Sequence, residues 1–256
     1  MKQLIVLTYL GLWACVSCAQ PSAPTSVVVR APSGVMLVQA PAPDQAFAYL
    51  ERTLADMDFF RANNYAVSLP DHSLFDGTAT AASNPTEHRA VFVKDVYRAA
   101  AFETALSIID QQKNQLRTAM ARIASWGTYD GFNTLDSVTV TLTLYGPGGS
   151  FNPDTGDIIL WTDTDGRFKG GGSLHTIIHE MIHLAVEHGI AQPLQLQHWE
   201  RERLVDLLAQ REFRDLLPDY RLQGGNEAPM DRFVVNTELS DMREAVAEYV
   251  RVGRAN

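Results

Sequence analysis

The chain has 256 residues, of which 46% are hydrophobic and 20% are charged, and its formal net charge is -9 at pH 7. This length and composition are typical of a soluble globular protein with one large domain or slightly more. The negative charge, without any cluster of Lys or Arg, argues against a nucleic-acid-binding protein.

The N-terminus has the pattern of an export signal. Lys2 precedes an apolar run over residues 4–13, which is too short to span a bilayer as a mature helix. Residues 1–19 are therefore predicted to be a signal peptide, or a lipoprotein signal in which Cys15 or Cys18 is lipidated and attaches the protein to a membrane. We expect an exported protein that is secreted, periplasmic or anchored to the outer membrane. Because both cysteines lie in this segment, the mature domain has no internal disulfide and no Cys-ligated zinc.

Residues 20–45 are rich in Pro, Ala, Ser and Val, which predicts an extended linker. The alternative is that the valine-rich runs at 27–30 and 35–38 add short strands. The folded domain is then expected over residues 46–256, with a helical N-terminal part at 46–126 and a catalytic part at 137–256.

Two helical stretches are predicted in the N-terminal part. Apolar residues recur at helical spacing from Phe47 to about Asn63, and again over residues 90–126, where one long helix or a broken pair fits. The intervening residues 64–87 lack periodicity and are rich in turn-forming residues, which predicts a long loop.

A β-hairpin is predicted before the next helix. Residues 138–145 alternate between apolar and polar side chains, which indicates a half-buried strand, and residues 157–162 form a second strand. Glycines at 170–172 then interrupt the chain. Ser173 is expected to cap a helix that starts at Leu174, and Gly189 predicts a left-handed end to that helix after His188.

This helix carries the motif H-E-x-x-H, formed by His179, Glu180 and His183. Two His four residues apart lie on one helical face, so their imidazoles can bind one cation, and the Glu can reach a water molecule on it. A catalytic zinc site needs three protein ligands and an open position for water, whose pKa the ion lowers. The alternative is a core helix with two satisfied histidines, although buried ionisable groups in so apolar a helix are costly unless partnered. The motif therefore predicts a zinc site that still lacks one ligand.

The order of these elements resembles that of the zincin metallopeptidases, in which a small sheet precedes the H-E-x-x-H helix and its edge strand pairs with an extended peptide. The resemblance covers the chain from about Val138 onward. It implies an α+β zincin-like fold, with a small sheet whose β-hairpin edge packs on the motif helix, followed by a mostly helical C-terminal part. Metzincins are set aside, because no third His follows His183 at their spacing.

The next predicted helix, from residue 198, carries a candidate third ligand. Glu202 lies 19 positions after His183, and Asp206 lies four positions after Glu202. This arrangement looks like that of the gluzincins, the thermolysin-like enzymes. The resemblance implies that Glu202 completes the zinc site and that Asp206 orients a His ligand by accepting its N–H. One departure is Arg201, which stands where the thermolysin pattern has Asn.

A rival third ligand lies near the C-terminus. Glu244 and Glu248 have the same four-residue spacing on the last predicted helix. Glu202 is favoured because a short connection returns it to the motif helix at little loop-closure cost. Either acidic pair could instead belong to a solvated face that pairs with nearby Arg residues.

Three further side chains are candidates for stabilising the oxyanion that develops during hydrolysis, which needs a hydrogen-bond donor aimed at the charge. They are His175, His198 and Tyr220. Each also has a structural alternative, such as covering a neighbouring turn or capping a helix.

By resemblance, we expect an exported zinc metallopeptidase acting on a peptide or protein substrate. Zn²⁺ would be bound by His179, His183 and Glu202, and Glu180 would be the general base on a zinc-activated water. One alternative is a non-catalytic envelope binding protein on a zincin-like scaffold, although such a protein has no use for the base. Others are an adaptor domain in which the motif is accidental and a zinc amidase acting on cell-wall peptides.

Overall fold

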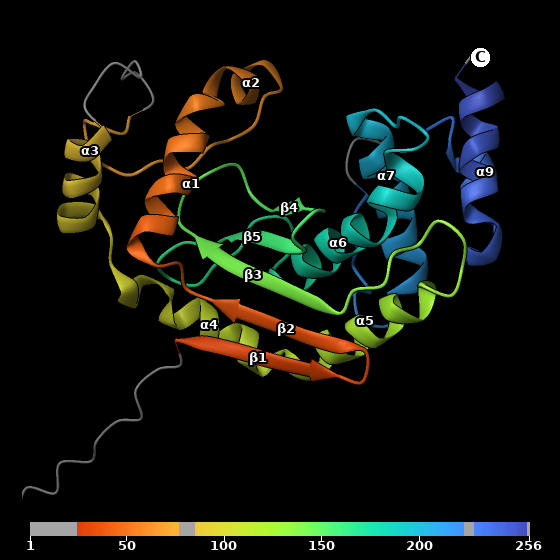
Figure 1. Ribbon diagram of the computed structural model, residues 1–256, viewed down its shortest axis with the longest axis horizontal. Helices are drawn as coiled ribbons and strands as arrows, with labels where there is room; N and C mark the ends of the chain where they lie inside the picture. Colours follow the sequence, from red (N-terminus) through yellow and green to blue (C-terminus); the bar gives the residue numbers. More distant parts are fainter. Residues whose placement is uncertain (1–24, 77–84, 223–227, 255–256) are drawn as a thin grey trace, which may run out of the picture.

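Five short strands form one mixed sheet in the order β1-β2-β3-β5-β4 (Figure 1). The computed structural model describes residues 25–76, 85–222 and 228–254. The strands are β1 (Ser26–Ala31), β2 (Gly34–Gln39), β3 (Ser137–Thr143), β4 (Ser150–Asn152) and β5 (Asp157–Trp161). β2, β3 and β5 are mutually parallel neighbours, whereas β1 and β4 pair antiparallel at the two edges. The predicted α+β class with a small sheet is confirmed.

The first two strands occupy much of the predicted linker. β1 and β2 form an antiparallel hairpin whose turn contains Pro32, and Val27, Val29, Met36 and Val38 alternate into the core. An extended linker is therefore wrong for residues 26–39, and the alternative of short strands is correct. Every second residue of these strands is buried, and most of the buried residues are valines, which favour strands. The prolines do not oppose this, because they lie outside the paired positions. The predicted export signal at 1–19 lies outside the described residues.

Helices cover the sheet and form both sides of the molecule (Figure 1). The α-helices of the described residues are α1 (Pro43–Ala55), α2 (Met57–Ala62), α3 (Pro85–Val91), α4 (Glu103–Gln111), α5 (Lys113–Trp126), α6 (Ser173–Val186), α7 (His198–Glu212), α8 (Asp231–Val234) and α9 (Met242–Glu248). The helix predicted from Phe47 is divided at Asp56, and the 90–126 region contains the broken pair α4 and α5, which meet at Gln112. None of these helices has the length and apolar character needed to span a membrane.

Two apolar clusters hold these elements together. The larger cluster joins the sheet to α4, α5, α6, α7 and α9. The smaller cluster lies under α1 and consists of Ala46, Phe47, Leu50, Phe75, Phe92 and Tyr145. The helices α1 and α2 consequently stand on one side of α6, and α7 and α9 stand on the other (Figure 1).

The hairpin beside α6 is formed by different strands from those predicted. β3 and β5 run parallel, so they are not a hairpin, and the antiparallel hairpin is β4 with β5. The loop over residues 144–149 connects β3 to β4, which is not its neighbour but the edge strand. β5 then lies between β3 and β4 and pairs with both. The predicted feature, a hairpin edge packed on the motif helix, is nevertheless present, because α6 contacts both β4 and β5.

Both ends of α6 differ from the prediction. Ser173 does not cap the helix; its hydroxyl donates to Gln112 Oε1 at 2.7 Å, and Gly172 is the N-cap residue. At the other end the chain continues into a π turn over Glu187–Ala191. Gly189 is required there for close packing, since a Cβ on it would lie 2.3 Å from the carbonyl oxygen of Gly131.

Candidate metal centre

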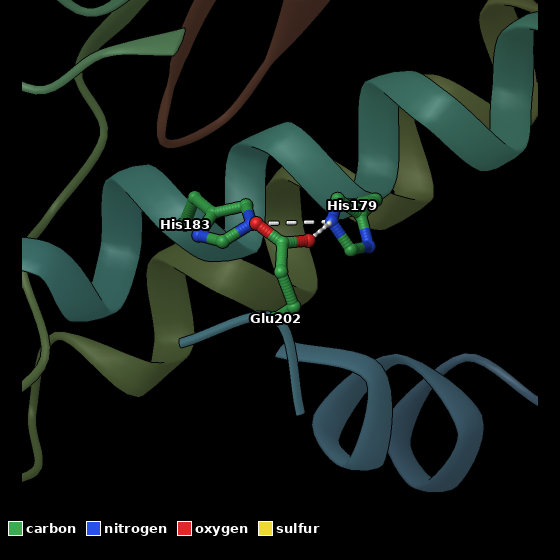
Figure 2. Close-up of side chains that lie close together, drawn as sticks. All are labelled: His179, His183 and Glu202. Carbon is green, nitrogen blue, oxygen red and sulfur yellow. Dashed lines mark hydrogen bonds and ion pairs between the residues drawn. The ribbon is translucent and has the colours of Figure 1, made fainter. Parts of the chain in front are cut away.

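Three predicted ligands converge between α6 and α7. His179 and His183 lie one turn apart on α6, and Glu202 reaches them from α7 (Figure 2). The two Nε2 atoms lie 3.1 Å apart, and the Glu202 carboxylate oxygens lie 3.1 Å from His179 Nε2 and 3.4 Å from His183 Nε2. All three donor atoms lie within 4.8 Å of one another, so this group could hold a metal ion.

The spacing of these atoms fits a small cation. Ligands at about 2.0–2.1 Å from a tetrahedral zinc ion stand roughly 3.3 Å from one another. Burial disfavours the carboxylate of Glu202, but hydrogen bonding to the two His rings outweighs it and holds the pKa of Glu202 well below its usual range. Burial likewise disfavours charge on His179, yet Glu202, Glu180 and Asp206 raise its pKa. The carboxylates around His179 therefore favour a positive charge beside its ring, whereas burial lowers the pKa of His183.

A buried chain of hydrogen bonds orients His179. Tyr220 donates its hydroxyl proton to Asp206 Oδ1 at 2.7 Å, and the Tyr220 oxygen lies 2.8 Å from His179 Nδ1. Because its single proton is engaged by Asp206, Tyr220 accepts from His179 Nδ1–H, which leaves the Nε2 lone pair for a metal. Asp206, with no exposed surface, also lies 3.6 Å from His179 Nδ1. The structure thus brings Asp206 to a His ligand as predicted, and adds Tyr220 between them.

Replacing Tyr220 with Phe removes this link and is expected to weaken zinc binding by about 10- to 100-fold. The ring itself, which stacks on His175 at 4.3 Å, would remain. The measurement is competition for zinc against a chelator of known affinity. Tyr249→Phe is the matched control. The Tyr249 hydroxyl donates to Glu200 Oε1 at 2.7 Å and does not contact His179, His183 or Glu202. Equal affinities in the two variants would contradict the orienting role of Tyr220.

Glu180 is a buried carboxyl beside the same ligands. A Cβ added to Gly149 would lie 2.4 Å from Glu180 Oε1, so a side chain at position 149 would crowd this carboxyl. Burial raises the pKa of Glu180 to about 7, with Glu202 adding to the rise and His179 opposing it. A carboxyl whose pKa lies near neutrality can both accept and return a proton.

The ligands and Glu180 lie in one cleft of about 1090 Å³. Its walls come from the edge strand β4, the glycines at 170–172, the segment 216–222 and Tyr65. Phe151 of β4 stacks on the ring of His183, with ring centroids 4.5 Å apart and planes 11° apart. The edge of the sheet is therefore held directly beside the candidate metal ligands.

No protein-family model matches this chain, and comparisons with curated proteins and with solved structures give no match either. The function is therefore inferred from the geometry of the site. In the described part of the chain, that geometry unites a group of residues that could hold a metal ion, the carboxyl of Glu180 and an accessible cleft.

The three candidates for oxyanion stabilisation all line the cleft, but they are not equivalent. Tyr220 is unsuited to the role, because its proton is donated to Asp206. Burial, with a contribution from His179, lowers the pKa of His175 to about 4, so that ring is a neutral donor at pH 7. His198 Nε2 lies 2.9 Å from the hydroxyl of Tyr65, and its Nδ1 lies 3.9 Å from Glu202 Oε1.

Sequence reasoning missed Tyr65, which reaches the cleft from the loop after α2. No motif marks it, and only the neighbouring aromatic residues Phe59 and Phe60, which its ring contacts, hint at a packed segment. By contrast, Glu244 is exposed on α9 and is absent from the group of converging ligands. The structure therefore brings Glu202, and not its rival, to the two His.

Proposed function

We infer that this chain is a zinc-dependent peptidase of the zincin type, with a gluzincin arrangement of ligands, that hydrolyses peptide bonds. The observation that carries the proposal is the convergence of His179, His183 and Glu202 in one cleft. The same cleft contains Glu180, whose pKa burial raises to about 7. We also propose export on the pattern of residues 1–19, which are either a cleaved signal peptide or a lipoprotein signal whose lipidated Cys attaches the protein to a membrane.

The surroundings of the ligands support a zincin-like scaffold. The H-E-x-x-H helix α6 packs on an edge hairpin of a small sheet, and α7 supplies Glu202 followed by Asp206. One side of β4 pairs with β5, and among the described strands its other side has no partner. An extended peptide could pair with that side and so pass the metal ligands in a defined direction.

The donor set suits zinc, because two imidazole nitrogens and one carboxylate are a common set of ligands for catalytic zinc. A bound zinc ion supplies Lewis acidity toward a carbonyl oxygen and lowers the pKa of water. Glu180 accepts a proton from the attacking water and delivers it to the leaving amine. Of the three side chains expected to stabilise the developing oxyanion, His175 and His198 line the cleft and, unlike Tyr220, do not donate to Asp206.

Metal dependence of peptide hydrolysis tests the proposal. The purified protein is incubated with a mixture of unrelated peptides after loading with zinc, after chelation, and after zinc is restored. New peptide termini detected by mass spectrometry should appear with zinc, disappear with the chelator and return when about one zinc per chain is bound. Stoichiometric zinc without cleavage of any peptide would favour the binding-protein alternative, and cleavage indifferent to the chelator would rule out metal catalysis.

A further inference from the structure

Arg201 is a cation fixed in the wall of the cleft. It precedes the ligand Glu202 on α7 and lines the same cleft. Its Nε donates to the carbonyl oxygen of Leu196 at 2.9 Å, and its Nη1 donates to Glu187 Oε1 at 2.7 Å. No described residue accepts a hydrogen bond from Nη2, and 33% of the side chain is exposed. The guanidinium is therefore anchored at two nitrogens and presents a third.

The anchor is itself buried. Glu187, in the π turn after α6, is only 1% exposed, and its Oε2 has no partner among the described residues. A buried carboxylate is costly unless it is paired, so the bond to Arg201 compensates the charge of Glu187 and at the same time holds the guanidinium in one orientation. Because this orientation exists before a ligand arrives, less conformational entropy is lost when a ligand binds.

The other cations of the cleft wall are arranged differently. Lys169 donates to the carbonyl oxygens of Ala66, Gly146 and Pro147, and its ammonium lies 4.6 Å from the centre of the Trp161 ring. Those contacts use its three protons to hold the loop before β4. Arg221 is exposed on the segment 216–222. Among the described cations lining the cleft, Arg201 combines a fixed position with spare donors.

We propose that Arg201 determines specificity by binding a carboxylate of the substrate in the cleft that holds the scissile bond. Guanidinium N–H groups match the planar geometry of a carboxylate, and a charge-assisted bond of this kind is stronger than one to an amide. The carboxylate is either the C-terminal group of a short peptide or the side chain of an Asp or Glu residue. This inference rests on the proposed peptidase function and adds the substrate class.

Matched peptides test the proposal. A peptide that the protein cleaves is prepared in two pairs of forms. In the first pair the C-terminus is free or amidated, and in the second a position flanking the scissile bond is Glu or Gln. The parent protein should show kcat/KM about 10- to 100-fold higher for one carboxylate form than for its amide. Arg201→Gln should abolish this preference, so that kcat/KM for the carboxylate form falls to that for the amide form in the same variant. Arg221→Gln, which removes an exposed charge of the same cleft, should keep the preference.

A binding measurement separates this inference from the proposed function. Peptide affinities are measured by calorimetry on the zinc-loaded Glu180→Gln variant, alone and combined with Arg201→Gln, so that no turnover is needed. A carboxylate preference that disappears with Arg201 supports the inference even if no peptide is cleaved. Cleavage without any carboxylate preference overturns it and leaves the peptidase intact.

A structural role for Arg201 is tested by a second variant. Arg201→Gln leaves the Glu187 carboxylate buried without its partner, so Glu187→Gln/Arg201→Gln is made to remove that charge as well. The double variant should retain zinc and fold, and should lack the carboxylate preference. If kcat/KM fell equally for the carboxylate and the amide substrates in both variants, the proposal would be overturned.

Discussion

Replacing Glu180 with Gln is expected to lower the rate of peptide hydrolysis by about 10²- to 10⁴-fold, the usual contribution of a general base. The amide keeps the size of the carboxyl and fits the space over Gly149, but it cannot accept a proton. Zinc binding should not change, because the converging donor atoms belong to His179, His183 and Glu202. The measurements are kcat on a cleaved peptide and the zinc content of the same preparation.

Glu200→Gln is the control for this change. Glu200 is a carboxylate of α7 that bonds to Tyr249 and Arg254 and does not line the cleft. The Glu200→Gln variant should keep the kcat of the parent, which would show that loss of any one carboxylate is not sufficient to lower the rate. If Glu180→Gln retained more than about a tenth of the parental kcat, the base would have to be another group.

Features that depend on short sequence separation were predictable. The four-residue repeat of a helix places His179 and His183 on one face, and the same repeat on α7 places Glu202 and Asp206 together. A short connection then limits where α7 can lie, so Glu202 returns to the motif helix. The predicted residues therefore meet in the structure, although nothing in the spacing fixes which oxygen faces which nitrogen.

Features that depend on long-range pairing were not predictable. Whether β3 and β5 run parallel or antiparallel depends on where the chain between them crosses the sheet, and the alternation of side chains is the same in both cases. Tyr65 reaches the cleft from an irregular segment, so no periodicity marks it, and nothing in the sequence showed that Tyr220 bonds to both His179 and Asp206. The bond between buried Glu187 and Arg201 is likewise a contact between separate elements.

Glu202→Ala is expected to lower zinc affinity on the order of a hundredfold or more, because a site with three ligands loses one that bears charge. Removing the carboxylate also takes away the negative charge that lies 3.1 Å from His179 Nε2 and 3.4 Å from His183 Nε2. Zinc per chain is measured after dialysis against a weak chelator, and melting temperature is measured with and without zinc. The parent should be stabilised by zinc, and the variant should lose most of this shift.

Glu244→Ala is the matched control and tests the rival ligand at the same time. Glu244 is exposed on α9, so its removal should leave both the zinc content and the zinc-dependent melting shift unchanged. The opposite result, with zinc retained in Glu202→Ala and lost in Glu244→Ala, would require α9 to supply the ligand and would contradict the arrangement in Figure 2. Loss of zinc only in Glu202→Ala would establish Glu202 as the third ligand, since the two variants remove the same group from different helices.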